Sequence, residues 1–251
     1  MIVVINGRDL HARPGDSLLD LARRTGIDIP TLCHHEGLEE WGGCRLCLVE
    51  VARPGGHGAA RVVPACLFPA RDGLRVDTDT PRIHRLRAGV LDLLLARCPQ
   101  SDTIQELALQ YGVRRTSFVE RKNPDKCILC NVCVRACTAV GANAIGTAGR
   151  GVLGEIALPF HDDPAACVGC GACALSCPTG AIDMVDTGFK RRIWQRDFER
   201  VRCSACGRPT LTQAHAAHLA TRSGLPAESF QVCDRCHREQ AGARFLDLLG
   251  K

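Results

Sequence analysis

Cysteines are the residues in this chain with the clearest chemistry. There are 17 among 251 residues, against ten aromatics (seven Phe, two Trp and one Tyr). Sixteen form four groups of four, and Cys98 stands apart. The groups are Cys33, Cys44, Cys47 and Cys66; Cys127, Cys130, Cys133 and Cys137; Cys167, Cys170, Cys173 and Cys177; and Cys203, Cys206, Cys233 and Cys236. Spaced pairs of this kind favour metal or redox chemistry, and the odd total leaves one cysteine over in any disulfide scheme.

The composition agrees with several small units held together by metals. Hydrophobic residues make up 45% and charged residues 24%, as in ordinary globular proteins. The few aromatics argue against one large core, and small domains often rely on structural metals or disulfides instead. The net charge of +5 does not indicate nucleic-acid binding. Four four-thiolate sites of about −2 each would bring the loaded protein to about −3.

The chain reads as cytoplasmic. The apolar run Val90–Ala96 is short and interrupted by Asp92, well below the roughly 18 residues of a membrane span. The first residues, Met1–Gly7, have neither the basic region nor the cleavage site of a secretory signal. In the cytoplasm thiols stay reduced, which again favours metal ligation over disulfides.

The two middle groups share one spacing, Cys-x2-Cys-x2-Cys-x3-Cys, and Pro178 follows the second. This repeats the run of bacterial two-cluster ferredoxins, in which the fourth cysteine of each run binds the other cluster. Thr138 stands where the first run would normally have proline. One [4Fe-4S] cluster is therefore predicted on Cys127, Cys130, Cys133 and Cys177, and a second on Cys137, Cys167, Cys170 and Cys173.

The elements around the first group predict a small sheet with one helix. Residues 2–5 form a strand that ends in the hairpin signal Asn6-Gly7, and Ser17 is a plausible cap for a helix ending by Gly26. A glycine-rich loop, 42–47, then carries two of the cysteines. Strand-like segments follow at 46–51, 61–65 and 74–76.

Three segments of this region carry a specific resemblance. Residues 31–35 (TLCHH), 43–50 (GCRLCLVE) and 64–66 (PAC) resemble the plant-type [2Fe-2S] ferredoxin fold, a β-grasp, at the start of the large iron-sulfur subunit of respiratory complex I. Diaphorase subunits of NAD-reducing hydrogenases and NAD-dependent formate dehydrogenases are similar too. The resemblance implies that Cys33, Cys44, Cys47 and Cys66 bind a [2Fe-2S] cluster. His34 and His35 are interpreted as loop residues rather than ligands.

The segment 81–125 is predicted to be helical and departs from those relatives. An apolar face runs through 84–97, Pro99 stops the helix, and a second begins at Asp102 with Gln105 as a capping-box candidate. The relatives carry one His and three Cys here, which bind an additional [4Fe-4S] cluster. This chain keeps only Cys98, so that cluster is predicted to be missing. Cys98 is then a buried spectator, or alternatively a ligand of the last site or of a partner's cluster.

The last group is chemically ambiguous. Cys203 and Cys206, and Cys233 and Cys236, form two Cys-x2-Cys turns that each resemble a zinc-ribbon or rubredoxin knuckle. Zn²⁺ is favoured, with a further iron-sulfur cluster or a single iron as alternatives. The alternative ligands are His215, His218 and His237. Four thiolates already close a structural zinc site, so these histidines are not needed.

Two further patterns are interpreted conservatively. Residues 149–154 match G-x-G-x-x-G but neither follow a convincing strand nor open a helix, so they are predicted to be a loop. The run Lys190–Arg192 is interpreted as a solvated face, with a docking patch for an acidic partner as the alternative. No P-loop, no Rossmann fingerprint in context and no nucleophile constellation is found. The chain has redox centres without an evident place for an organic substrate.

Together these features predict an α+β protein of four parts. Residues 1–80 form the β-grasp domain, 81–120 a helical segment, 121–187 the two-cluster ferredoxin domain and 188–251 a four-cysteine, zinc-ribbon-like domain. The predicted role is a non-catalytic electron-transfer subunit. It would relay single electrons between an NAD(H)- and FMN-binding flavoprotein subunit and another catalytic subunit, such as a hydrogenase or formate dehydrogenase. The alternatives are a free-standing ferredoxin-like carrier and a regulatory nucleic-acid binder, although one tyrosine in the chain disfavours base stacking.

Overall fold

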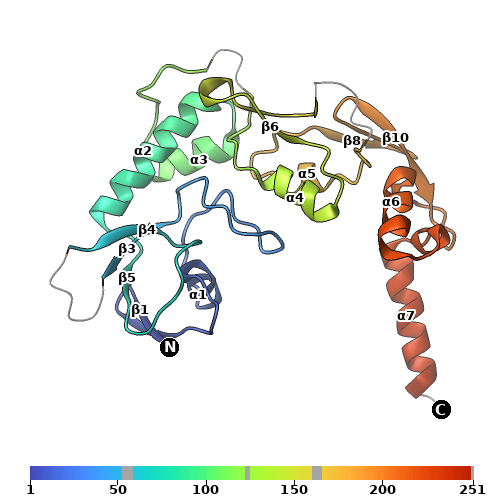
Figure 1. Cartoon of the computed structure of the whole chain (residues 1–251), viewed down its shortest axis with the longest axis horizontal. Helices are drawn as coiled ribbons and strands as arrows, with labels where there is room; N and C mark the ends of the chain where they lie inside the picture. The colour runs from blue at the N-terminus through green and yellow to red at the C-terminus, as the bar shows by residue number, and fades with distance from the viewer. Residues whose placement is uncertain (53–58, 122–124, 160–165, 250–251) are drawn as a thin grey trace.

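The computed structural model describes residues 1–52, 59–121, 125–159 and 166–249. The chain is elongated (Figure 1). An N-terminal sheet lies toward one end of the long axis and helix α7 (Asp234–Leu249) toward the other, with helices α4 (Val132–Val140) and α5 (Ala172–Leu175) between them. None of the described helices is long and apolar enough to cross a membrane.

The N-terminal sheet has five strands in the order β2-β1-β5-β3-β4. Their bounds are β1 Ile2–Ile5, β2 Arg8–His11, β3 Leu48–Ala52, β4 Arg61–Pro64 and β5 Arg75–Asp77. All neighbouring pairs are antiparallel except β1 and β5. The predicted hairpin is confirmed, because Asn6 and Gly7 both have positive φ (51° and 77°) between β1 and β2. Two such residues form the type I′ turn that matches strand twist.

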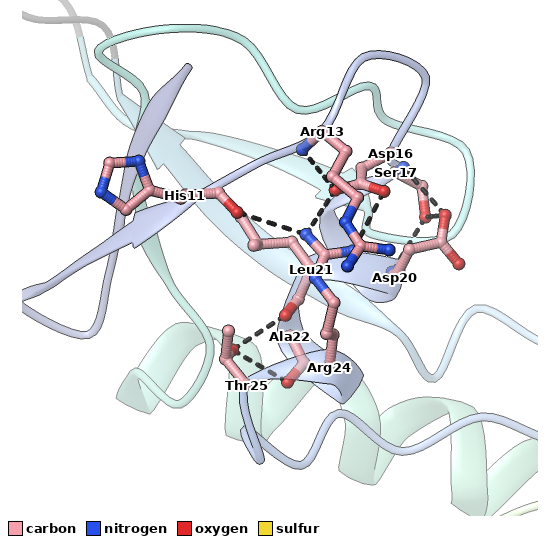
Figure 2. A network of polar contacts seen from close by, with 9 residues as sticks. All are labelled: His11, Arg13, Asp16, Ser17, Asp20, Leu21, Ala22, Arg24 and Thr25. Carbon is pink, nitrogen blue, oxygen red and sulfur yellow. Dashed lines mark hydrogen bonds and ion pairs between the residues drawn. The ribbon is translucent and has the colours of Figure 1, made fainter.

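Helix α1 (Leu18–Arg24) covers this sheet and begins where the sequence predicted. Ser17 Oγ accepts from the backbone N–H of Asp20, and the Asp20 carboxylate accepts from the N–H of Ser17, which completes a capping box. Figure 2 shows a second tie, in which Arg24 bonds to Asp16 and to the carbonyl of His11. The leucines of α1 are buried against the strands in one core. Cys47 and Cys66 of the first cysteine group belong to this same core.

Two helices follow, α2 (Pro81–Arg97) and α3 (Asp102–Gln110). Thr80 caps α2 through the N–H of Ile83. The predicted capping box at α3 is wrong, because Ser101 stands at the cap without a side-chain bond and Gln105 donates to the carbonyl of Pro99 instead. Both helices share a core with the first cysteine loop and with Cys130. The helical segment thus joins the first cysteine group to the middle ones.

The middle region is built from short elements. They are α4 Val132–Val140, β6 Gly146–Ala148, the 3-10 helix η1 Gly151–Leu153, β7 Glu155–Ala157 and α5 Ala172–Leu175. The two short helices α4 and α5 lie against each other. The G-x-G-x-x-G match directly follows β6, contains η1 and joins β6 to the antiparallel strand β7. It opens no α-helix, as expected, but the expectation that it does not follow a strand is wrong.

The C-terminal region begins with a four-stranded antiparallel sheet, in the order β11-β10-β9-β8. Its strands are β8 Met184–Thr187, β9 Lys190–Ile193, β10 Arg196–Arg202 and β11 Pro209–Thr212, and α6 Gln213–Ser223, η3 Ala227–Phe230 and α7 follow. Strand β8 precedes the expected boundary after residue 187, yet it pairs with β9 beyond it. One sheet therefore spans both sides of that boundary.

A buried arginine ties α2 to the first cysteine loop. Arg87 is 3% exposed, and its guanidinium donates to the carbonyls of Leu46 and Leu48, both at 2.9 Å, and to the Tyr111 hydroxyl at 3.2 Å. Leu46 lies between two of the cysteines. Arg87 thus satisfies backbone oxygens that would otherwise be buried without a donor.

Replacement of this arginine is expected to destabilise the chain. Arg87→Met keeps the aliphatic stem but leaves two buried carbonyls without donors, which costs about 2–4 kcal/mol of unfolding free energy. Urea unfolding of the metal-loaded protein measures the change. The matched control is Arg85→Met, an exposed arginine on the same helix, which should change stability by less than about 0.5 kcal/mol. Equal stability of the two variants would contradict this role for Arg87.

Candidate metal centres

The structure brings the first cysteine group together in the loop before β3 and at the end of β4. Cys33, Cys44, Cys47 and Cys66 are all buried and none forms a disulfide. The sulfurs of Cys47 and Cys66 lie 3.4 Å apart. The backbone N–H of Leu32 donates to the Cys44 sulfur, and that of Cys44 to the Cys33 sulfur, both at 3.4 Å. Backbone N–H groups aimed at sulfur stabilise the thiolate form.

Crowding divides these thiols into two hydrogen-bonded pairs. Hydrogen bonding with Cys33 lowers the pKa of Cys44, and hydrogen bonding with Cys66 lowers the pKa of Cys47. The pKa of each partner, Cys33 and Cys66, is raised in turn. Four buried thiolates this close would repel one another. A cationic centre relieves that repulsion, so the donor set fits a metal cluster.

In the folded chain the two middle groups of cysteines exchange their fourth members. Cys127, Cys130, Cys133 and Cys177 line one cavity of about 120 Å³. Cys137, Cys167, Cys170 and Cys173 line a second, narrower cavity of about 20 Å³. Each cavity thus combines three cysteines of one run with the fourth of the other, as the sequence pattern predicts. Burial raises the pKa of Cys130 to about 11 and that of Cys133 to about 12, which disfavours thiolates without a cation beside them.

The two runs share a backbone pattern. Leu129 and Asn131 in the first, and Gly169 and Gly171 in the second, all have positive φ, between 54° and 83°. They occupy equivalent positions beside the second cysteine of each run, immediately before α4 and α5. The left-handed conformation turns the chain so that three sulfurs face one point. Leucine adopts it only at a cost in strain.

The fourth cysteines are held by main-chain donors. The N–H of Ala144 donates to Cys137 Sγ at 3.2 Å, and the N–H of Ala181 donates to Cys177 Sγ at 3.3 Å. Each donor comes from the loop that follows its own cysteine. These contacts orient both sulfurs. The same type of contact thus occurs after each of the two cysteine runs.

Two arginines connect the sites, and no local pattern in the sequence marks either of them. Arg135 on α4 donates to the carbonyls of Cys33 and Glu39 in the first cysteine loop. Arg97 at the end of α2 donates to the carbonyls of Cys127 and Gly154, both at 2.8 Å. Cys33, Cys44 and Cys130 also belong to one buried core. The first centre and the first middle centre are therefore neighbours on a continuous protein framework.

The last group converges from two elements. Cys203 and Cys206 lie between β10 and β11, Cys233 lies immediately before α7, and Cys236 lies in its first turn. The four sulfurs lie within 4.8 Å of one another. Those of Cys206 and Cys233 are 3.8 Å apart, which equals the edge of about 3.8 Å expected for a tetrahedron with Zn–S bonds of about 2.3 Å. The second pair opens a helix rather than a second β-hairpin.

A main-chain N–H group donates a hydrogen bond to a sulfur of this site as well. The N–H of Cys233 donates to Cys203 Sγ at 3.3 Å and lowers the pKa of Cys203 to about 6. Hydrogen bonding with Cys206 raises the pKa of Cys236 to about 12. The predicted alternative ligands do not join the cluster. His218 Nε2 contacts the carbonyl of Val140 at 2.9 Å, and the grouped ligand atoms are the four sulfurs.

Cys98 does not join any of the four groups of ligands. It ends α2, is fully buried, and its thiol donates to the carbonyl of Leu94 at 3.2 Å. Burial raises its pKa to about 12. A buried, neutral thiol with a carbonyl acceptor has the environment of a packing residue rather than of a ligand.

Side chains from the C-terminal sheet pack on the second middle site. Arg191 pairs with Asp186 and donates to the carbonyls of Gly169 and Cys170. The interpretation of residues 190–192 as a solvated face is therefore wrong for Arg191. Its strand pairs in the sheet, and its side chain is only 12% exposed. Phe198 lies against Gly169, where an added Cβ would come within 2.6 Å of the ring.

This contact predicts a specific effect of a small substitution. Gly169→Ala combines an unfavourable φ of +62° with a clash against Phe198, so the cysteine loop must move. We expect loss of one [4Fe-4S] cluster, about 4 iron atoms per chain, measured by iron analysis of anaerobically purified protein. Gly180→Ala is the matched control, because it has a φ of +60° and nothing within 4 Å of its added Cβ. Full iron in both variants would contradict the packing argument.

Comparison with known protein families gives two domain matches. The family of 2Fe-2S iron-sulfur cluster binding domains matches residues 2–81, and the family of 4Fe-4S binding domains matches residues 160–183. The first match contains the whole first cysteine group. The second contains the cysteine run that ends at Cys177.

Curated relatives are similar over most of this chain. A subunit of an NADH-quinone oxidoreductase of Rhizobium meliloti is 34% identical over 231 residues, which are 82% of this chain and 26% of the relative. The alpha subunit of the NADPH-Fe(3+) oxidoreductase of Geobacter sulfurreducens is 30% identical over 238 residues, 85% of this chain and 28% of the relative. The chain thus spans just over a quarter of the length of these relatives.

A solved structure agrees with these similarities. A chain of an NAD+-reducing [NiFe]-hydrogenase in the H2-reduced state matches with a TM-score of 0.54 and 29% identity, over 62% of this chain and 74% of that one. The resemblance predicted from the cysteine motifs is therefore confirmed. The chain is an iron-sulfur protein with an N-terminal 2Fe-2S ferredoxin-like domain and a 4Fe-4S ferredoxin domain, similar to subunits of NADH- and NADPH-linked oxidoreductases.

Proposed function

We propose that the chain is an electron-transfer subunit. It relays single electrons between an NAD(H)- and FMN-binding flavoprotein subunit and another redox catalytic subunit, such as a hydrogenase or a formate dehydrogenase. The observation that carries this proposal is the series of neighbouring buried thiol sets, joined through Arg97 and Arg135. The relatives named above are subunits of oxidoreductases, which supports the same role.

The ligand assignment that we propose follows the spatial grouping of the thiols. Cys33, Cys44, Cys47 and Cys66 hold a [2Fe-2S] cluster; Cys127, Cys130, Cys133 and Cys177 hold one [4Fe-4S] cluster; and Cys137, Cys167, Cys170 and Cys173 hold another. When bound, such clusters take up and release one electron at a time. Cysteine sets of this spacing, buried and free of disulfides, are suited to iron-sulfur binding.

The protein itself would contribute position, burial and hydrogen bonds. The helices α2 and α3 cover the first and the first middle cysteine sets with an apolar core that excludes water. Main-chain N–H groups, among them those of Leu32, Ala144 and Ala181, donate to ligand sulfurs. Such bonds and the degree of solvent exposure set cluster potentials. A chain with this role needs no substrate pocket of its own.

For the last site we propose Zn²⁺ held by Cys203, Cys206, Cys233 and Cys236. The sulfur separation of 3.8 Å and the four-thiolate set support a tetrahedral ion. The role would be structural. The ion would fix the β10–β11 hairpin to α7, while Thr212 and Arg222 on the intervening segment bond to the carbonyls of Val168 and Val140 beside the second middle site. We further propose a cytoplasmic location, where thiols stay reduced and available to metals.

Removal of one ligand tests the zinc assignment. Cys206→Ser is expected to release about 1 Zn per chain and to leave about 10 Fe, because three thiolates hold a structural zinc poorly. Elemental analysis of anaerobically purified protein measures both metals. Cys98→Ser is the matched control and should change neither value. A loss of about 4 Fe from Cys206→Ser would instead assign an iron-sulfur cluster to this site.

NADH-driven reduction tests the proposed function. The full chain, purified anaerobically from its own cells with its bound partners, should show flavin absorbance, and NADH should bleach its iron-sulfur absorbance. The same chain separated from its partners should be reduced by dithionite but not by NADH. A chain that migrates alone at 27.1 kDa while retaining full redox activity would support the free-standing carrier instead.

A further inference from the structure

Arg191 is a largely buried cation that contacts the backbone of the second middle site. Its Nη1 donates to the carbonyl of Cys170 at 2.8 Å and to that of Gly169 at 3.2 Å. Glycine at position 171, with a φ of +83°, allows this approach, because an added Cβ would come within 3.1 Å of the same nitrogen. The positive charge therefore lies against the loop that carries three of the site's four cysteines, Cys167, Cys170 and Cys173.

Three neighbouring strands place this arginine in a group of three charged side chains. Arg191 on β9 is the cross-strand partner of Asp186 on β8 and of Phe198 on β10, and directly paired residues put their side chains on the same face of a sheet. Arg200 lies two residues beyond Phe198 and shares that face. Because Phe198 packs against Gly169, this face is the one that covers the cysteine loop.

The carboxylate of Asp186 offsets only part of the positive charge. It accepts from Nε of Arg191 at 2.7 Å and from Nη2 at 2.9 Å, which is a bidentate ion pair. Nη1 of Arg200 lies 3.1 Å from the same carboxylate. Two guanidinium groups thus share one carboxylate, and the group keeps an excess of positive charge. Both arginine side chains are largely buried, so salt screens this charge weakly.

We propose that Arg191 is a positioning residue that raises the midpoint potential of the [4Fe-4S] cluster assigned to the second middle site. Reduction adds one negative charge to a cluster with its four thiolates. A fixed cation nearby stabilises that reduced state more than the oxidised state, and a nearby carboxylate does the opposite. Arg191 therefore raises the potential and Asp186 lowers it. The inference rests on the proposed function, specifically on the assignment of a cluster to this site.

Removal of the cation tests this role by redox titration followed by electron paramagnetic resonance. Arg191→Met keeps the aliphatic stem and removes the charge. We expect a more negative midpoint potential for one [4Fe-4S] cluster, and a smaller shift in Arg191→Lys, which keeps the charge. Arg192→Met is the matched control. It removes the same charge from the next side chain, which is exposed and points to the other face of the sheet, so both potentials should stay unchanged. Unchanged potentials in Arg191→Met, or an equal shift in Arg192→Met, would overturn the proposal.

Removal of the carboxylate should shift the same potential in the opposite direction. Asp186→Asn keeps the shape of the side chain but leaves two arginines without a counter-charge, so the midpoint potential should become less negative. A defect in packing alone gives no reason for opposite shifts in the two variants. Asp197→Asn, at an exposed aspartate of the same sheet, is the matched control and should shift neither cluster. The Asp186→Asn titration also decides the question if Arg191→Met does not load iron. An unchanged or more negative potential in Asp186→Asn would overturn the proposal.

Iron content of the wild-type protein separates the two possible failures. About 10 Fe per chain with no shift in the variants keeps the cluster assignment and removes the role of Arg191. A wild-type protein that lacks the signal of one [4Fe-4S] cluster overturns the assignment and this proposal together.

Discussion

The structure depends on one electrostatic constraint. Cysteine thiolates that lie close together repel one another unless a metal cation lies between them. Sixteen cysteines converge on four places, fifteen of them fully or partly buried, and no disulfide relieves the crowding. Within the first group the sulfurs of Cys47 and Cys66 are 3.4 Å apart. Without metal, burial raises the pKa of thiols such as Cys130 and Cys133, which disfavours the thiolate form that binds metal. With metal, the binding free energy becomes part of the folding free energy.

The remaining architecture supports these four sites. The capped helix α1 and the five-stranded sheet hold the first loop, and Arg87 fixes that loop to α2 from inside the core. Arg97 and Arg135 extend the framework to the middle cysteines through backbone carbonyls. The C-terminal sheet then covers the second middle site with Arg191 and Phe198. Few aromatics are needed, because each small core is completed by a cysteine site.

Sequence reasoning located the N-terminal hairpin, the cap at Ser17, α2, α3 and all four cysteine groups, because spacing and turn residues are local signals. It did not find the ties made by Arg97, Arg135 and Arg191, since a lone arginine looks the same whether it is solvated or bonded to a distant carbonyl. Trp194, which lines both middle cavities, was missed for a related reason. Its place between the cavities depends on a hairpin turn that lacks the usual asparagine or glycine.

The central claim is that twelve of these cysteines hold three iron-sulfur clusters in one chain. The most direct measurement is iron and acid-labile sulfide analysis of the anaerobically purified full chain, combined with paramagnetic resonance after reduction by dithionite. The account predicts about 10 Fe and about 10 sulfides per chain, with signals from both cluster types. A colourless protein without a paramagnetic signal would contradict it.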